Sequence, residues 1–178
     1  MRRRAYRLAM HENASDTMAL SRRRLLIGVA ALGALTGCAS LRERASADPS
    51  FEVTHTDAEW HQLLSAQQYN VLRNGGTERP FSSELNDEHR SGVFSCAGCA
   101  LALFSSTTKF DSGTGWPSFW KPLDRAVIER SDSSLGMNRT EVLCRRCGGH
   151  LGHVFDDGPQ PTGLRYCMNG VAMTFRAT

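Results

Sequence analysis

The sequence lacks an apolar run long enough to cross a membrane, an internal repeat, and an excess of positive charge outside its N-terminus. Its longest apolar stretch, residues 25–37, has 13 residues, whereas a transmembrane helix needs about 20. The first 37 residues hold seven arginines and two acidic residues, a net charge of +5, so the whole-chain charge of +3 leaves −2 for residues 38–178. Such a mildly acidic domain lacks the basic surface that binds phosphate backbones, and we expect no nucleic-acid partner.

The N-terminal segment has the pattern of an export signal. Ser21 precedes three arginines and the apolar residues 25–37, which is typical of a twin-arginine signal peptide. Leu35-Thr36-Gly37-Cys38 resembles a bacterial lipoprotein signal, with cleavage before Cys38 and a lipid on its sulfur; an uncleaved anchor is the alternative. We therefore predict a protein on the periplasmic side of the bacterial cell envelope, with a signal peptide, a lipidated flexible tether and one domain over residues 1–37, 38–50 and 51–178.

The pattern of the domain indicates a mainly β fold. Thr56 and Glu59 fit a capping box that opens a helix over residues 57–68, with Trp60, Leu63 and Leu64 on its buried face. From residue 92 onward, short β-prone runs alternate with glycine-rich turns. We predict a compact antiparallel β-sheet domain with one or two N-terminal helices. Its strands are expected at residues 92–95, 101–105, 126–131, 139–143, 151–155, 164–168 and 171–175.

Five of the six cysteines lie in the domain, and four of them form two CxxC pairs separated by 44 residues. Two such turns present four thiolates, which suits one tetrahedral Zn²⁺. The long gap between the two pairs predicts that the metal joins two distant segments of the chain. Disulfides are the alternative, because an exported protein meets an oxidising compartment. The predicted ligands of a structural zinc ion are Cys96, Cys99, Cys144 and Cys147.

Cys167 stands outside this predicted metal site. Arg165 lies two residues earlier, and therefore on the same face of an extended strand. A nearby cation lowers the pKa of a thiol and raises the fraction of thiolate, the nucleophilic form. Arg165 therefore favours a reactive Cys167. A buried structural cysteine is the alternative.

Three further groups have a functional and a structural interpretation. His150 and His153 follow the second CxxC pair, and beside a free thiol they would form an acid–base set; isolated histidines are more often satisfied core or surface residues. Residues 156–159, Asp-Asp-Gly-Pro, indicate a turn. The loop of residues 113–120 gathers three large aromatic side chains. There Trp116 suits an apolar wall for a small methyl-bearing ligand, although core packing also explains the rings.

Two long runs resemble the B-type peptide-methionine (R)-S-oxide reductases. They are CRRCGGHLGHVFDDGP at residues 144–159 and TGLRYCMN at residues 162–169, and residues 113–119 match the Gly-Trp-Pro-Ser-Phe segment of that family. The resemblance covers about residues 55–176. It implies a mostly antiparallel β fold of the Mss4-like or β-tent type, with the zinc remote from the active site.

The resemblance also implies roles for individual residues. Cys167 would be the catalytic nucleophile, Arg165 would support it, and Trp116 would form the pocket wall for the sulfoxide methyl group. Polar side chains would surround the sulfoxide oxygen: His150, His153 and Asn169.

The implied reaction reduces methionine-(R)-sulfoxide, mainly in oxidised proteins, through a sulfenic acid on Cys167. Many family members carry a resolving cysteine just before the Gly-Trp-Pro segment, where this chain has Thr114. With Cys38 lipidated and four cysteines on zinc, no spare thiol remains. We therefore predict a one-cysteine cycle in which an external thiol, such as a thioredoxin-like donor, regenerates the enzyme. The predicted protein is a monomer that repairs oxidative damage in the envelope and is held at the membrane by its lipid.

Two other classes of function fit part of the pattern. A zinc-ribbon-like binding module explains both CxxC pairs and uses the aromatics of residues 113–120 as a contact patch, but it leaves Cys167 and both histidines idle. A rubredoxin-like electron carrier would hold iron on the same four thiolates, and its colour would distinguish it from a zinc protein.

Overall fold

The computed structural model describes residues 50–178, which include the whole predicted domain. The predicted signal peptide, the lipid site Cys38 and all but the last residue of the predicted tether lie outside the described residues, so these stay predictions. Among the residues described, no helix has the length and apolar character needed to cross a membrane.

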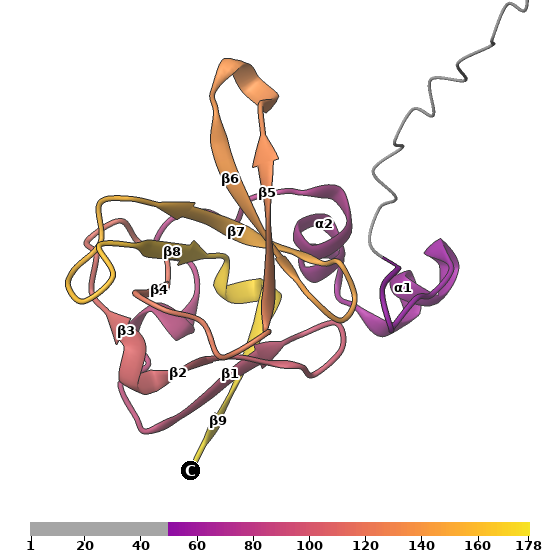
Figure 1. Ribbon diagram of the computed structural model, residues 1–178. Coiled ribbons are helices and arrows are strands. Elements are labelled where there is room, and N and C mark those ends of the chain that lie inside the picture. The colour runs from indigo at the N-terminus through magenta and orange to yellow at the C-terminus, as the bar shows by residue number, and fades with distance from the viewer. Residues whose placement is uncertain (1–49) are drawn as a thin grey trace, which may run out of the picture. The chain divides into compact units, whose positions relative to one another are not determined.

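Two short helices open the domain, α1 (Asp57–Leu63) and α2 (Ala66–Asn74) (Figure 1). The capping box at the start of α1 is confirmed. Thr56 Oγ1 accepts the backbone N–H of Glu59 at 3.3 Å, and the Glu59 carboxylate accepts the backbone N–H of Thr56 at 2.7 Å. These bonds satisfy amide groups that a helix start leaves without intrahelical partners.

The expectation of one continuous helix over residues 57–68 is wrong. Ser65 and Gln68 form a second capping box, which starts a new helix directly after the first. Leu63, at the end of α1, is consequently 59% exposed rather than buried, whereas Leu64 lies in the core. After the break, α2 buries Val71 and Leu72 in the core.

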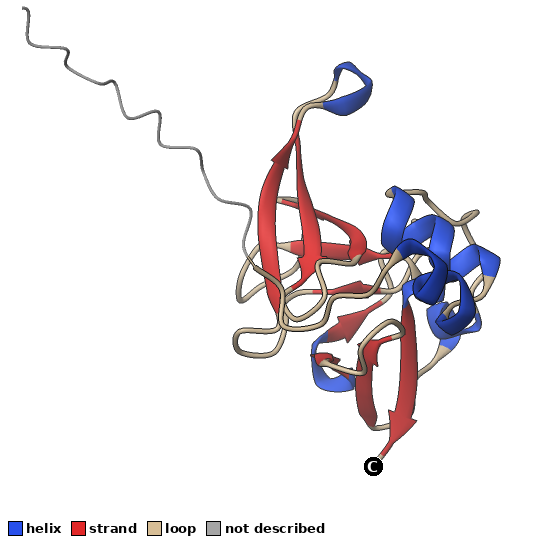
Figure 2. Cartoon of the chain, turned by 90° about the vertical axis from the view of Figure 1, so that its right-hand side faces the viewer, coloured by secondary structure: helices blue, strands red, loops and turns tan. Residues whose placement is uncertain are grey.

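The strands form two antiparallel sheets. The smaller has the order β2-β1-β9 and the larger the order β3-β4-β8-β7-β6-β5; Figure 2 shows the strands with the main helices gathered to one side. The small sheet comprises β1 (Gly92–Cys96), β2 (Ala102–Ser105) and β9 (Met173–Ala177). The large sheet comprises β3 (Lys109–Phe110), β4 (Ser118–Phe119), β5 (Val127–Asp132), β6 (Arg139–Cys144), β7 (His150–Phe155) and β8 (Arg165–Met168).

The mainly antiparallel β fold with N-terminal helices is confirmed. All seven predicted strands are present, with ends shifted by one or two residues. The sequence does not predict β3 and β4, because two residues are too few to show alternation. The last strand begins at Met173 rather than at residue 171, since Gly170–Ala172 forms a 3₁₀ turn, η4.

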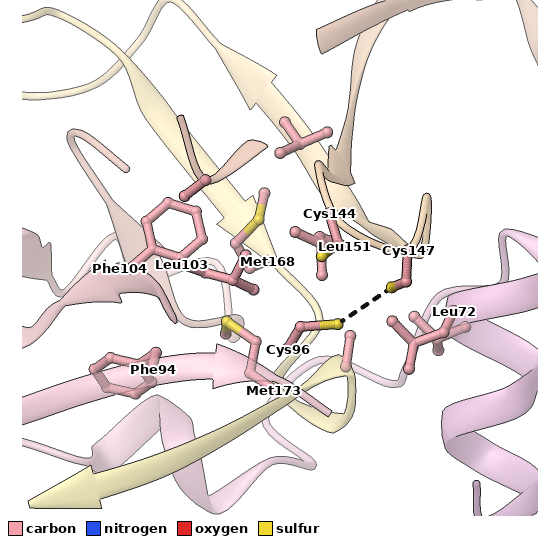
Figure 3. Close-up of a cluster of buried hydrophobic side chains, with 14 of the residues drawn as sticks. Leu72, Phe94, Cys96, Leu103, Phe104, Cys144, Cys147, Leu151, Met168 and Met173 are labelled. Carbon is pink, nitrogen blue, oxygen red and sulfur yellow. Dashed lines mark hydrogen bonds between the residues drawn. The ribbon is translucent and has the colours of Figure 1, made fainter. Parts of the chain in front are cut away.

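Side chains from both sheets form one buried cluster. Phe119 of the large sheet packs against Phe94 and Phe104 of the small sheet, with ring centroids 4.9 and 4.3 Å apart. Figure 3 shows Met168 and Leu151 in the same cluster near Cys96, Cys144 and Cys147 of the two CxxC pairs.

Strand β8 separates the core from the candidate site. Tyr166 and Met168 are buried in the core. Because alternate residues of a strand point to opposite faces, Arg165 and Cys167 lie on the other face of the large sheet, as the sequence predicts. That face carries the polar groups described next.

Candidate active site and metal centre

The four CxxC cysteines converge on one point. Their Sγ atoms all lie within 4.8 Å of one another, with 3.7 Å between Cys96 and Cys147 and 3.5 Å between Cys99 and Cys144. Disulfide sulfurs would be about 2.05 Å apart, and none of the five described cysteines is in a disulfide. Four sulfurs around a zinc ion with Zn–S bonds of about 2.3 Å would be about 3.8 Å apart. The cluster therefore fits a single tetrahedral metal ion.

Each CxxC pair lies in the tight turn of a hairpin, between β1 and β2 or between β6 and β7. In both turns, the amide after the second cysteine bonds back to the carbonyl of the first: Ala100 to Cys96 at 2.8 Å and Gly148 to Cys144 at 2.9 Å. One hairpin belongs to the small sheet and the other to the large sheet. The four thiols thus join distant segments, as the gap between the pairs predicts.

Cys167 lies in the middle of the large sheet, with Ser118 of β4 as its neighbour on one side and His153 of β7 on the other. Its side chain is half-buried rather than sealed. The Thr114 hydroxyl oxygen is 3.9 Å from its Sγ. Ser112 links this threonine to Ser118 through hydroxyl contacts of 2.8 and 2.7 Å, so the thiol faces a row of hydroxyl groups.

Burial raises the pKa of the Cys167 thiol above its ordinary value, although Thr114, Arg165 and Ser118 each act to lower it. Arg165 therefore acts on the thiol in the direction that the sequence indicates, but desolvation of the buried sulfur outweighs the nearby cation. Burial thus opposes formation of the Cys167 thiolate, and Thr114, Arg165 and Ser118 offset part of that cost.

Arg165 is held in one position from two directions. Its Nε and Nη2 each donate a 2.8 Å hydrogen bond to the Asp157 carboxylate, and its guanidinium carbon lies 4.5 Å from the centre of the Phe155 ring. A paired, stacked guanidinium of this kind has a fixed geometry. The sequence explains Asp157 only as a turn residue, and it misses this contact with Arg165.

Both predicted histidines, which lie on β7, are paired with carboxylates from the next two strands of the large sheet, β6 and β5. His150 Nδ1 lies 2.7 Å from Glu141, His153 Nε2 lies 2.9 Å from Asp132, and the two ring centroids are 5.4 Å apart. A carboxylate only accepts, so each of these nitrogens carries its hydrogen. The other nitrogen of His150, Nε2, is buried without a hydrogen-bond partner among the described residues.

The two histidine–carboxylate pairs differ in which member has its pKa shifted. Burial lowers the pKa of His150, against the opposing effect of Glu141. Hydrogen bonds from Ser134 and His153 hold the pKa of Asp132 well below its usual range. The carboxylates of Asp132 and Glu141 come from β5 and β6, and the sequence did not mark them because their contacts with the histidines depend on strand register and side-chain direction in the sheet.

Asn169 and Trp116 are joined through Glu78, which the sequence also misses. Asn169 Oδ1 accepts the backbone N–H of Glu78 at 2.9 Å, while Asn169 Nδ2 donates to the carbonyl of Leu151 at 3.1 Å. The indole N–H of Trp116 donates to the Glu78 carbonyl at 3.2 Å. The Glu78 carboxylate accepts the amides of Gly170 and Val171 at 2.6 and 2.8 Å. In this arrangement Asn169 positions the segment that holds Trp116.

The fold and the site place a half-buried free cysteine beside imidazole and guanidinium groups, and they gather the four other described cysteines in a cluster that could hold a metal ion, as in a thiol-containing enzyme. The model of the SelR domain family matches residues 64–177.

Three relatives share the name peptide methionine sulfoxide reductase MsrB. That of Thiobacillus denitrificans is 58% identical over 121 residues, 67% of this chain and 92% of that protein. That of Pseudomonas putida F1 is 56% identical over 126 residues, 70% and 96% of the two chains. That of Methanosarcina barkeri is 54% identical over 126 residues, 70% and 88%. The chain therefore belongs to the MsrB family of peptide methionine sulfoxide reductases, and its resemblance to that family is confirmed.

Proposed function

We propose that this protein reduces methionine-(R)-sulfoxide in oxidised proteins to methionine, with Cys167 as the nucleophile. The observation that carries the proposal is the half-buried, unpaired Cys167 thiol next to His153 in the sheet and 3.9 Å from the Thr114 hydroxyl. A binding module would have no use for this thiol or for two carboxylate-paired imidazoles.

The first step transfers the sulfoxide oxygen to the cysteine. The Cys167 sulfur attacks the sulfoxide with an electron pair, a new S–O bond forms on the cysteine as the S–O bond of the substrate breaks, and the oxygen remains on the enzyme as sulfenic acid. Sulfur is reduced in the substrate and oxidised in the cysteine, and the thiol proton balances the new S–OH group. Arg165, fixed by Asp157, stabilises the thiolate as it forms.

The histidines suit the proton transfer in this step. Glu141 fixes the tautomer of His150 in which the buried Nε2 carries no hydrogen, and Asp132 does the same for Nδ1 of His153. Each carboxylate stabilises its imidazole when the ring takes a proton. The proton is then delivered to the sulfoxide oxygen, which makes the sulfur open to attack.

The second step needs thiols from outside the domain. Four of the five described cysteines form the metal cluster, and Thr114 occupies the place beside Cys167 where a resolving cysteine would act. One external thiol condenses with the sulfenic acid to give a mixed disulfide and water, and a second thiol releases Cys167. A thioredoxin-like donor supplies both thiols.

The metal centre has a structural role in this proposal. Cys96, Cys99, Cys144 and Cys147 hold a zinc ion, whose bonds link the two sheets. The export signal and Cys38 support a lipid-anchored protein of the cell envelope, where oxidised proteins would be repaired.

The experiment that tests the function compares wild type with Cys167→Ser. Wild type is expected to reduce methionine-(R)-sulfoxide but not the (S)-epimer, and to form a dimedone adduct at Cys167 after one turnover. The variant should lose turnover to background while its metal content and circular dichroism stay unchanged. Turnover in the variant, or an intramolecular disulfide at Cys167 in wild type, would contradict the proposal.

A further inference from the structure

The turn of residues 79–82 presents a large aromatic residue where glycine is preferred. The Ser82 amide bonds to the Arg79 carbonyl at 3.3 Å, Pro80 occupies the second position, and Phe81 in the third position has a φ of 60°. A positive φ at this position is typical of a type II turn, which favours glycine there. A bulky side chain with a positive φ is strained, and such residues cluster at functional sites.

Burial of the Phe81 ring does little to offset that strain. It is 69% exposed, the highest value among the exposed large apolar side chains of the described residues. Its backbone is nevertheless fixed, because the Phe81 N–H donates a 2.7 Å hydrogen bond to the carbonyl of Gly115. The strained backbone therefore holds a phenyl ring toward solvent in a defined position.

That position lies at the edge of the candidate active site. A Cβ atom built on Gly115 would lie 2.8 Å from two atoms of the Phe81 ring, so the ring covers this glycine. Gly115 is flanked by Thr114, whose hydroxyl is 3.9 Å from Cys167 Sγ, and by Trp116. The same segment is anchored through Glu78, whose carbonyl accepts the Trp116 indole N–H.

We propose that Phe81 is a substrate-contacting residue that binds the polypeptide on either side of the oxidised methionine. This inference rests on the proposed function. The sulfoxide must reach Cys167, and three bonds separate its sulfur from the Cα atom of its own residue. The Phe81 ring covers Gly115, which directly follows Thr114, so it is placed to meet a neighbouring residue of the substrate rather than the sulfoxide group.

The chemistry of the ring favours a polypeptide over the free amino acid. An uncharged phenyl face gains by covering apolar side chains and peptide groups. Free methionine sulfoxide instead carries an ammonium and a carboxylate close to its Cα, and these groups stay hydrated. The ring therefore distinguishes the two kinds of substrate without touching the reacting atoms.

The test compares kcat/KM for two substrates with dithiothreitol as the reductant. One is a capped peptide with a single methionine-(R)-sulfoxide between apolar residues, and the other is free methionine-(R)-sulfoxide. Phe81→Ala is expected to lower kcat/KM about tenfold for the peptide and less than twofold for the amino acid. Leu63→Ala, which removes another exposed apolar side chain from the end of α1, should change neither.

Further variants separate the ring from the turn. Phe81→Tyr should keep wild-type activity on the peptide, and Phe81→Gly, which suits the positive φ, should lose as much as Phe81→Ala. Equal losses on both substrates, or no loss on either, would overturn the inference. A loss that appears only with a protein thiol donor would also overturn it and assign the ring to donor binding. If wild type reduces neither substrate, the proposed function itself fails.

Discussion

The described cysteines occupy two regions that differ in the burial of the thiol and in the groups around it. Three of the cluster cysteines, Cys96, Cys144 and Cys147, are 0–3% exposed, and every cluster sulfur has other sulfurs as neighbours. Cys167 is half-buried and faces hydroxyl groups, an imidazole strand neighbour and a guanidinium. The difference comes from local geometry: tight hairpin turns gather thiols, whereas a strand position isolates one on a single face.

The largest expected effect follows from breaking the cluster. Cys144→Ser removes one of four ligands, and structural zinc binding is worth about 10–16 kcal/mol in small domains, which matches or exceeds the typical stability of a domain. We expect this variant to lose its metal and its cooperative unfolding transition, as measured by elemental analysis and thermal melting. A folded, metal-free Cys144→Ser would show that the cluster is not a structural centre.

The next effect would convert the isolated thiol into a paired one. Thr114→Cys places a second sulfur about where the hydroxyl lies, 3.9 Å from Cys167 Sγ, and Gly113 and Gly115 on either side let the loop close toward disulfide distance. After one turnover with sulfoxide, the variant should lose the mass of two hydrogens, whereas wild type should gain one oxygen. Thr107→Cys, on an exposed turn, is the control and should behave as wild type.

A persistent sulfenic acid in Thr114→Cys would contradict this prediction. It would mean that the loop of residues 113–115 cannot bring a thiol to Cys167, and that the threonine is not the reason for the need of an external donor.

The comparison of the two regions shows which features a sequence can reveal. The four-cysteine cluster is predictable because the two cysteines of each pair are close in the sequence. Only the contact between the two turns depends on residues far apart in the chain. The shared face of Arg165 and Cys167 is also predictable, since it depends on strand alternation alone. Glu141, Asp132 and Glu78 escape prediction because strand register and loop packing, which depend on the tertiary fold, bring them to the site.

Two features escape the sequence for the same physical reason. The sequence places Arg165 near the Cys167 thiol but does not reveal how deeply the sulfur is buried, so it does not show the net direction of the pKa shift. Likewise it shows an apolar face over residues 57–68 but not the packing that favours two helices with separate capping boxes. Local chemistry is readable in both cases, whereas desolvation and packing depend on the tertiary fold.

A smaller effect is expected on the pKa of Cys167 when the nearby cation is removed. Arg165→Met removes a cation that favours the thiolate, so the pKa of Cys167, already raised by burial, should rise further. The midpoint of the iodoacetamide alkylation rate should move to higher pH, and the rate at pH 8 should fall roughly three- to tenfold, since one pKa unit is a tenfold change in thiolate. Arg176→Met, on β9, is the control. An unchanged or lower midpoint would contradict the role assigned to Arg165.

The smallest expected effect distinguishes the two halves of the cluster itself. Ala100 and Gly148 occupy equivalent places after the second cysteine of each turn, with φ values of 57° and 67°. Because alanine is strained in this conformation, Ala100→Gly should raise the free energy of unfolding of the metal-loaded protein by roughly 0.5–1 kcal/mol. Gly148→Ala should lower it by more, because its Cβ would lie 2.3 Å from the Phe51 ring. Urea unfolding measures both variants. If Ala100→Gly instead destabilises the protein, the lost alanine contacts outweigh the strain, and the two turns are equivalent in shape but not in packing.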